Sequence, residues 1–179
     1  TVPCGNYTGI SARDMRHTLR RVAPLVNDGQ VYSADFTGAA SLIGGNLNAD
    51  AYVDVLDFGA FAGQFGVNYG TPSTTCSTPY PHADINGDGS VGIQDYSFIQ
   101  TNFLLFGDVT LCGNFVLAPP NTPGGPTTDI SIDQLVADGL FDSARADLNL
   151  DSRLNQADLV FAIANGFPAC TADFNGLGG

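Results

Sequence analysis

The sequence predicts a small α+β fold, in which an N-terminal β-hairpin with short strands precedes three loop–helix repeats stapled by disulfides. Three observations lead to this prediction. A strand–turn–strand pattern lies near the N-terminus, a polar twelve-residue segment recurs three times before an amphipathic helix, and the chain contains four cysteines. With 179 residues, of which 44% are hydrophobic, the chain is long enough to bury a modest core.

The charge of the chain is strongly one-sided. Eighteen acidic residues oppose six basic ones, so the formal net charge is −12. This surplus argues against nucleic acid or an anionic membrane as a partner and favours a cation-binding protein. Every acidic residue is Asp and every basic residue is Arg. Because Asp favours turns and loops over helices, the negative charge should lie in loops.

The cysteines, at positions 4, 76, 112 and 170, lack the CxxC spacing of a zinc or redox site. We therefore predict two disulfides in a secreted protein, extracellular or at a cell surface. Four cysteines allow three connectivities. A Cys76–Cys112 bond would close the second repeat, leaving Cys4 and Cys170 to tie the chain ends together. No signal peptide is visible, so we expect a processed mature chain, and no apolar run is long enough for a membrane span.

The first predicted element is a β-hairpin from Met15 to Phe36, after an extended and irregular segment at residues 1–14. "HTLRRVAPLV" leads into the turn signal "NDG", and "QVYSADF" returns. Alternation places Val31, Ser33 and Asp35 on one face of the returning strand, and Tyr32, Ala34 and Phe36 on the other. Pro24 should keep the first strand at a sheet edge.

Three repeats follow the hairpin. They read "NLNADAYVDVLDFGAFAGQFG" from Asn46, "DINGDGSVGIQDYSFIQTNFL" from Asp84 and "DLNLDSRLNQADLVFAIANGF" from Asp147. Each is a polar loop that runs into a short amphipathic helix. A further helix, "SIDQLVADGLF", is predicted before the third loop. We expect the aromatic side chains of the helices to pack in the core: Phe58, Phe61, Phe65, Phe98 and Phe103.

Connectors rich in Pro and Gly, "GTPSTTCSTPYPH" and "APPNTPGGPTT", separate the repeats. They predict four segments along the chain. These are an N-terminal β element (1–45), a paired repeat module (46–112), a Pro/Gly linker (113–130), and the third repeat with a tail (131–179).

The three loops align without gaps as twelve-residue calcium loops of the EF-hand kind. In such loops side-chain oxygens at positions 1, 3 and 5 converge on the ion, the carbonyl at position 7 adds a ligand, position 9 acts directly or through water, and an acid at position 12 closes the shell. The predicted ligand residues are Asn46, Asn48, Asp50, Tyr52, Asp54 and Asp57 in the first loop, Asp84, Asn86, Asp88, Ser90 and Asp95 in the second, and Asp147, Asn149, Asp151, Arg153, Asn155 and Asp158 in the third.

Oxygen ligands without His, Cys or Met favour Ca²⁺ over transition metals, so we predict up to three Ca²⁺ ions. Each loop carries three carboxylates, whose repulsion a dication would neutralise. The alternative is that clusters of Asp, Asn and Gly are ordinary turns. Three such clusters in one register, each with an apolar anchor at position 8 (Val53, Val91, Leu154), favour the cation interpretation.

The loops differ at position 6, where a calcium loop turns sharply. The second loop has Gly89 there and is the most nearly ideal. The third has Ser152. The first has Ala51 and an Asn at position 1, which Asp54 at position 9 offsets in part.

The pattern D-x-N-x-D-G-x-V-x-x-x-D, closed by Asp, resembles the type I dockerin repeats of secreted bacterial proteins. The first two repeats, about 46–106, resemble one paired dockerin module. This resemblance implies calcium-bound EF-hand or F-hand loops and a cohesin-like protein as partner. Dockerins bind cohesins mainly through loop positions 10 and 11 and the following helix. Here those positions are Val55-Leu56, Ile93-Gln94 and Gln156-Ala157.

We predict no enzymatic activity, because His17 and His82 lie outside any nucleophile or metal motif and the carboxylates belong to the cation loops. The favoured function is that of an extracellular, calcium-stabilised structural protein that self-assembles into a filament or surface assembly. Edge strands of the hairpin could add to a neighbour's sheet, and a head-to-tail contact of this kind gives a homopolymer. The alternatives are an anchoring module for a cohesin-like receptor and a calcium-binding domain of a larger secreted protein.

Overall fold

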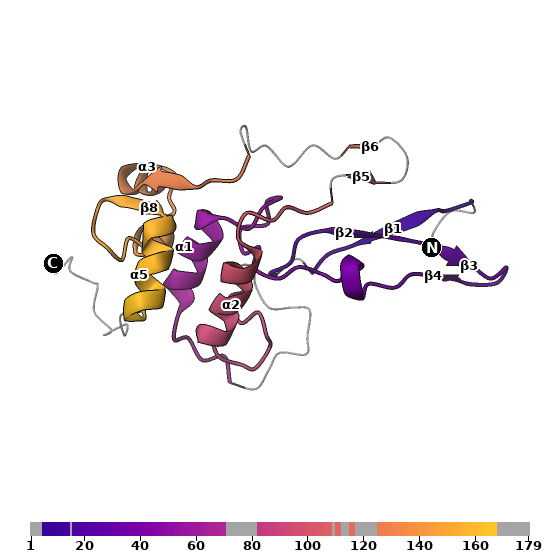
Figure 1. The fold of residues 1–179 in the computed structure, drawn as a ribbon, viewed down its shortest axis with the longest axis horizontal. Coiled ribbons are helices and arrows are strands. Elements are labelled where there is room, and N and C mark those ends of the chain that lie inside the picture. Colours follow the sequence, from indigo (N-terminus) through magenta and orange to yellow (C-terminus); the bar gives the residue numbers. More distant parts are fainter. Residues whose placement is uncertain are drawn as a thin grey trace.

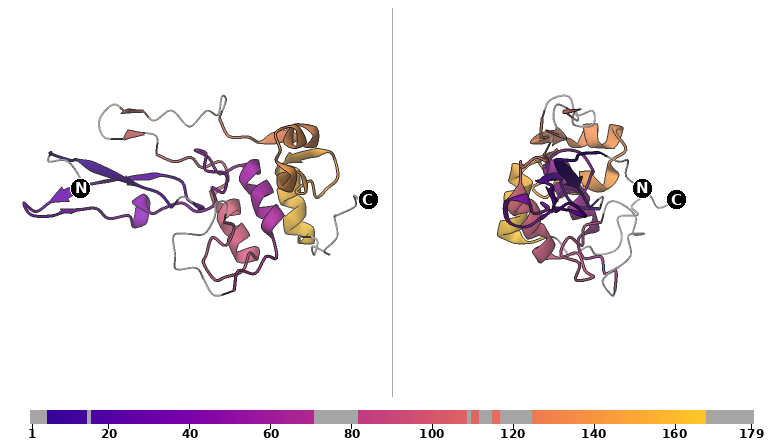
Figure 2. Two further views of the ribbon diagram at one scale, coloured as in Figure 1. Left: turned by 180° about the vertical axis from the view of Figure 1, so that it is seen from behind. Right: turned by 90° about the vertical axis from the view of Figure 1, so that its right-hand side faces the viewer.

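A computed structural model describes residues 5–14, 16–70, 82–108, 110–111, 115–116 and 125–167. Figure 1 shows a body of helices and an arm of short strands that projects from it, and the arm follows the long axis in Figure 2 as well. The fold is therefore a small mixture of helices and antiparallel strands, as predicted. Its elements are β1 (Gly9–Ala12), β2 (Arg21–Pro24), β3 (Val26–Asn27), β4 (Tyr32–Ser33), the 3₁₀ turn η1 (Gly38–Ala40), α1 (Val55–Gln64), α2 (Ile93–Asn102), β5 (Thr110–Leu111), β6 (Phe115–Val116), β7 (Asp129–Ser131), α3 (Ile132–Ala137), α4 (Phe141–Ala144), β8 (Arg153–Asn155) and α5 (Gln156–Asn165).

The arm consists of two successive two-stranded antiparallel ladders. β1 pairs with β2, and Gly9 lies opposite Pro24 at one end of the ladder. The prediction that residues 1–14 are irregular was wrong for the four residues of β1. Pattern alone could not reveal this strand, because its partner was expected to pair elsewhere in a longer hairpin.

The "NDG" turn is confirmed, although the ladder around it is only two residues long on each side. β3 pairs with β4 across the turn. Gly29 adopts φ 92°, a left-handed conformation that glycine accepts readily. The Asp28 carboxylate accepts the N–H groups of Gln30 (2.9 Å) and Val31 (2.8 Å), so the turn is held by its own side chain.

A helix follows each predicted loop, and all three start in the same register. α1, α2 and α5 each have ten residues and begin at loop position 10. The apolar residue at position 8 is buried every time, as expected of an anchor: Val53, Val91 and Leu154.

The first two repeats complete one another. The Val53 N–H of the first loop donates to the Leu105 carbonyl, after α2, at 3.0 Å. In the second loop the Val91 N–H donates to the Val67 carbonyl, after α1, at 2.9 Å. Each loop is therefore paired with the segment that leaves the other repeat's helix, and the two repeats form one reciprocal unit.

The third repeat packs on the first. The predicted entering helix is confirmed as α3, and α4 follows it. α4 lies so close to α1 that a Cβ added at Gly59 would be 2.6 Å from the Ser143 Cβ atom. β7 pairs with β8 of the third loop, with Ile130 opposite Leu154. The last residues of the predicted linker are thus part of a strand.

One hydrophobic core joins all three repeats. Phe58 and Phe61 are fully buried, and Phe65 and Phe103 pack partly buried against the same core. The expectation was wrong for Phe98, which is 37% exposed on the outer side of α2. The buried core side chains are Leu19, Leu47, Val53, Val55, Phe58, Phe61, Ala83, Ile85, Val91, Tyr96, Ile99, Leu135, Ala146, Leu154, Leu159 and Ala162.

Phe167, which follows α5, closes the core with aromatic contacts that the sequence did not reveal. Its ring stacks on Phe65 with centroids 4.3 Å apart and meets Phe61 and Tyr96 edge-to-face, both at 5.4 Å. The Tyr96 hydroxyl donates to the Leu159 carbonyl at 3.2 Å. α2 and α5 are therefore joined by both packing and a buried hydrogen bond.

All four cysteines lie outside the described residues, so the two predicted disulfides stay a prediction. None of the helices in the described segments has the length and apolar character that a lipid bilayer requires of a spanning helix.

Candidate metal centres

The position-12 carboxylate has the same three backbone partners in every loop. In the second loop, Asp95 Oδ1 accepts the N–H groups of Ile85 (2.7 Å) and Asn86 (2.9 Å), and Oδ2 accepts that of Gly92 (2.9 Å). The carboxylate therefore ties loop positions 2 and 3 to position 9. The corresponding distances are 2.6, 3.1 and 2.7 Å for Asp57, and 2.8, 3.3 and 3.0 Å for Asp158.

Positions 3 and 5 also interact identically in the three loops. In the third loop, the Asn149 amide donates to Asp151 Oδ2 at 3.1 Å, and Asn149 Oδ1 accepts the Asp151 N–H at 3.0 Å. Asp151 Oδ1 then accepts the N–H of Arg153 at position 7 (2.9 Å). The same bonds join Asn48, Asp50 and Tyr52 in the first loop, and Asn86, Asp88 and Ser90 in the second.

The second and third loops share the sharp turn at position 6. Gly89 and Ser152 adopt φ values of 96° and 68°, in the left-handed region. This conformation points the position-6 N–H at the position-1 carboxylate, and the bond lengths are 3.0 Å to Asp84 Oδ2 and 2.9 Å to Asp147 Oδ2. The second and third loops therefore share the same backbone turn, although their residues at position 6 differ.

The first loop turns differently. Ala51 at position 6 is not among the described residues with positive φ. The Asn46 side chain at position 1 donates through its amide to the Asp50 carbonyl at 2.7 Å. The difference at position 1 has a chemical cause, because an Asn supplies an amide donor where Asp has only acceptors.

Two position-1 oxygens are buried without a hydrogen-bond partner. Asn46 is 1% exposed and Asp84 is 4% exposed, and in each the Oδ1 atom has no donor near it. A buried acceptor without a partner costs roughly 1–3 kcal/mol. Both atoms belong to the first residue of a predicted calcium loop, where the ion would supply the missing positive partner.

The three carboxylates of the first loop are held in an environment that opposes their ionisation. Burial raises the pKa of Asp54 to about 6, despite the backbone N–H groups that bond to it. Burial also raises the pKa of Asp57 well above its usual value, and the neighbouring charges of Asp54 and Asp50 add to the rise. The pKa of Asp50 is raised by burial as well. A dication in this loop would reverse these penalties.

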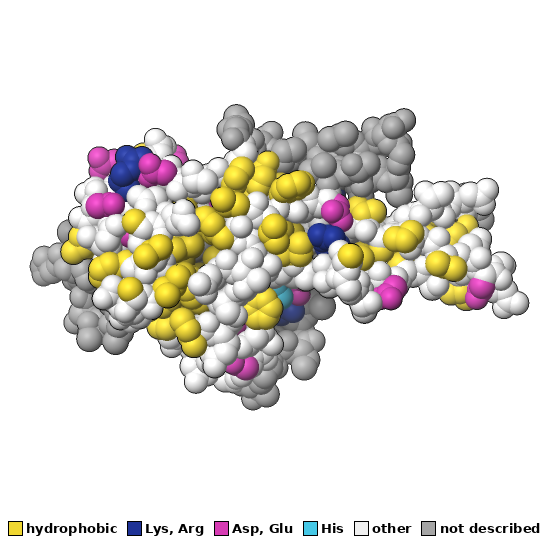
Figure 3. Space-filling model, viewed as in Figure 1, with side chains coloured by type: hydrophobic (Ala, Val, Ile, Leu, Met, Phe, Trp, Pro, Cys, Tyr) yellow, Lys and Arg dark blue, Asp and Glu magenta, His cyan; other side chains and the backbone are white. Residues whose placement is uncertain are grey.

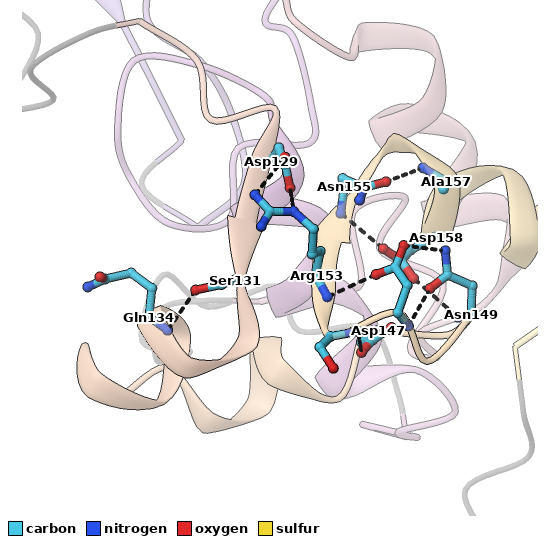
Figure 4. Close-up of polar contacts among 11 residues, drawn as sticks. Asp129, Ser131, Gln134, Asp147, Asn149, Arg153, Asn155, Ala157 and Asp158 are labelled. Carbon is cyan, nitrogen blue, oxygen red and sulfur yellow. Dashed lines mark hydrogen bonds and ion pairs between the residues drawn. The ribbon is translucent and has the colours of Figure 1, made fainter.

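The other two loops are more exposed to solvent. Hydrogen bonds from Asn86 and Ser90 lower the pKa of Asp88, whereas burial raises the pKa of Asp158. The Arg153 guanidinium turns away from its loop and makes two 2.7 Å bonds to Asp129 (Figure 4). Only the main chain of Arg153 is thus available to the third loop.

The side chains at position 9 cap helices. Asp54 accepts the Leu56 N–H at 2.8 Å and the Thr127 N–H at 2.6 Å, and Asn155 accepts the Ala157 N–H at 2.7 Å. Sequence analysis missed this role. The available signal was an Asp or Asn followed three residues later by Asp, which is the spacing of a capping box.

The side-chain oxygens of the three loops are ligands that suit a hard cation, but the carboxylates of a loop do not converge on one point. Within the described segments, no three His, Cys, Asp or Glu side chains stand together as a metal-binding group. The position-12 carboxylates face backbone N–H groups instead. An ionised carboxylate has about four acceptor positions, and three N–H bonds leave one free to bind an ion.

The two histidines lie beside the second loop. His82 is buried and its ring stacks on Tyr69 with centroids 4.4 Å apart. His17 lies with Nε2 3.8 Å from Asp14 Oδ2, and burial lowers its pKa. His82 therefore packs as a buried core side chain, and His17 packs at the boundary between the core and the surface.

The chain matches no protein-family model, no curated protein and no solved structure, so these comparisons identify no relative.

Proposed function

We propose that the protein binds up to three Ca²⁺ ions and serves as an extracellular, calcium-stabilised structural subunit that associates with copies of itself. The main support is the pair of buried, unpartnered oxygens at position 1 of two loops, on Asn46 and Asp84. The repeated hydrogen-bond scaffold adds to it, because the shared bonds at positions 3, 5 and 12 hold side-chain oxygens at equivalent places in the three loops. Three bound ions would change the formal charge from −12 to about −6.

Calcium binding is tested by calorimetric titration of the wild type and of Asp88→Ala. Asp88 supplies the position-5 carboxylate of the second loop and is exposed, so its loss spares the core. We expect the number of bound ions to fall by one. At a calcium concentration 100 times the dissociation constant, the lost site removes about 2.7 kcal/mol of stabilisation.

Asp133→Ala is the matched control, because it removes a carboxylate that is also exposed from α3, outside every loop. Its stoichiometry should equal that of the wild type. A wild type without a calcium-dependent heat signal, or an Asp88→Ala variant that binds as many ions as the control, contradicts the proposal. Electron microscopy with calcium and with excess chelator tests whether the subunits assemble.

The alternative is an anchoring module that binds a cohesin-like receptor. The favouring observation is the second repeat, where position 10, Ile93, and position 11, Gln94, are both exposed at the start of α2. The equivalent Val55 of the first repeat is buried, and its N–H donates to the Thr127 carbonyl. Pull-down with cohesins tests this alternative, and Ile93→Asp should abolish any capture that occurs.

A further inference from the structure

The end of the first loop is bonded to the segment that precedes β7. The Thr127 N–H donates to Asp54 Oδ2 at 2.6 Å, and the Thr127 carbonyl accepts the Val55 N–H at 3.2 Å. Both backbone groups of Thr127 therefore bond to consecutive residues of the first repeat, although 73 positions of sequence separate Thr127 from Asp54. The first loop is thus closed by a segment that leads into the third repeat.

The Thr127 bond fixes the direction of a buried carboxylate. Asp54 is fully buried, and its two oxygens are held separately, Oδ1 by the Leu56 N–H at 2.8 Å and Oδ2 by the Thr127 N–H. Burying a charged group is costly unless hydrogen bonds replace its water. These bonds use two of about four acceptor positions, so the others can bind an ion directly or through water, as position 9 of a calcium loop does. Without the Thr127 N–H, Asp54 would lose the donor that orients Oδ2.

The first loop is the one with a charged side chain at position 9. The corresponding residues of the other loops are Gly92, which has no side chain, and Asn155, which is uncharged. The first loop also has Asn46 at position 1, where the other two loops have Asp, so Asp54 supplies one of its three carboxylates. Asn46 is 1% exposed, and its Oδ1 atom has no hydrogen-bond partner. This buried acceptor supports cation binding by the first loop independently of its acids.

Residues 127–131, the bridging segment, are bonded to the third loop as well. Thr127 lies two residues before Asp129, the first residue of β7, and β7 pairs with β8 at positions 7–9 of the third loop. The Asp129 carboxylate accepts two 2.7 Å bonds from the guanidinium of Arg153 at position 7 (Figure 4). This pair is half exposed, and Figure 3 shows basic and acidic side chains next to one another over the third repeat. The bridging segment therefore contacts the first loop at one end and the third loop along the rest.

We propose that Thr127 positions the Asp54 carboxylate for the first Ca²⁺ ion, and that the bridging segment couples the first calcium site to the third. This inference rests on the calcium binding in the proposed function and adds a regulatory link between two of its sites. An ion in the first loop holds the Asp54 carboxylate in place, which favours its bond to Thr127 and so the docked bridging segment. That segment in turn holds β8, which presents position 7 to the third ion. By linkage, an ion in the third loop strengthens the first site by the same factor.

The test compares chains in which chosen loops are disabled at position 5. Asp88→Ala/Asp151→Ala leaves only the first site, Asp50→Ala/Asp88→Ala leaves only the third, and Asp88→Ala leaves both. Calcium calorimetry gives the binding constants of each chain. The product of the two constants in the two-site chain should exceed the product of the single-site constants by about 5-fold or more, and this ratio is the coupling factor.

Thr127→Pro, introduced into each of these chains, removes the N–H that Asp54 accepts. It should lower the affinity of the first-site chain by about 5-fold or more and bring the coupling factor close to one. Thr127→Ala is the matched control, because it changes the side chain and keeps the N–H. Thr128→Pro places the same ring at the next residue, whose N–H bonds to no described residue of the first loop. Both controls should bind calcium like their parent chains, whereas a merely structural effect of proline would lower stability in chelator and leave the coupling factor unchanged.

Amide hydrogen exchange tests the inference without a proline, and it decides the matter if Thr127→Pro does not fold. In the first-site chain, calcium should slow the exchange of the Thr127 N–H and of β7 by about 5-fold or more relative to chelator. The inference is overturned if the first-site chain binds no calcium, if calcium binds there without slowing these amides, if the coupling factor is one without any proline, or if Thr127→Ala loses as much affinity as Thr127→Pro. In these cases the calcium binding of the wild type still stands. A wild type that binds no calcium refutes the proposed function and this inference together.

Discussion

Replacing Asp95 with Ala should destabilise the protein even when calcium is absent. In a calcium loop the acid at position 12 supplies oxygen ligands to the ion. Here the Asp95 side chain is fully buried and accepts three backbone N–H groups, so it also holds the loop to its helix. Asp95 should therefore stabilise the folded loop even when a chelator has removed calcium.

The expected loss of stability follows from the three backbone N–H groups that lose the Asp95 carboxylate as their acceptor. Ile85 is buried, and its unpaired N–H costs about 1–3 kcal/mol. Asn86 and Gly92 are accessible to water, so each lost bond costs about 0.5–1.5 kcal/mol. We expect Asp95→Ala to lower the free energy of unfolding by about 2–6 kcal/mol.

The assay is denaturant unfolding in excess chelator and in saturating calcium, at about 15 °C, near the usual maximum of stability. Asp88→Ala is the comparison, because Asp88 is exposed and the three hydrogen bonds that its carboxylate accepts lie within its own turn. The Asp88→Ala variant should lose stability mainly in calcium, whereas the Asp95→Ala variant should lose stability in both calcium and chelator. If Asp95→Ala and the wild type unfold alike in chelator, the structural role of this carboxylate is refuted.

Three other outcomes are expected. In chelator, the contribution of Asp54 to the free energy of unfolding should fall as the pH rises from about 4 to 6 and then level off. The folded state binds a proton at Asp54 up to its pKa of about 6, above the ordinary 3.8. At 1.36 kcal/mol per pKa unit this group contributes at most about 3 kcal/mol, and calcium should abolish the fall, which urea titrations at several pH values would measure. Gly59→Ala should lower the free energy of unfolding by about 1–3 kcal/mol because its new Cβ would overlap Ser143, and Ser143→Gly in the same chain should restore most of the loss. Phe167→Ala should cost about 2–4 kcal/mol in thermal or urea unfolding, since its ring contacts four aromatic side chains, and an unchanged midpoint would show that the ring does not stabilise the core.

The repeats made much of the body predictable. Their register predicted a helix after each polar loop, and a helix does follow each loop. Alternation around "NDG" likewise predicted the turn near Gly29. These features depend on local chemistry, which a single sequence displays directly.

The rest depends on partners far apart in the chain. No periodicity shows that β1 pairs with β2, or that Gly59 leaves room for Ser143 of α4. Phe98 illustrates the limit, because an amphipathic pattern marks a residue as apolar without saying whether a neighbour covers it. In the candidate site, the residue types of the loops could be predicted. The direction of the Asp57 carboxylate could not, since it depends on which N–H groups the folded loop brings within reach.

The reciprocal pairing of the first two repeats imposes an order on folding. The second loop pairs at Val91 with residues that precede it, and the third pairs at Leu154 with β7, which also precedes it. The first loop is different, because Val53 needs Leu105, about 50 residues further along the chain. While the chain is being synthesised, the first repeat therefore keeps an unpaired strand edge until α2 and the residues after it have been made. The loop that is made first is therefore completed only after the second, and a chain interrupted between α1 and α2 would carry an exposed edge available to other chains.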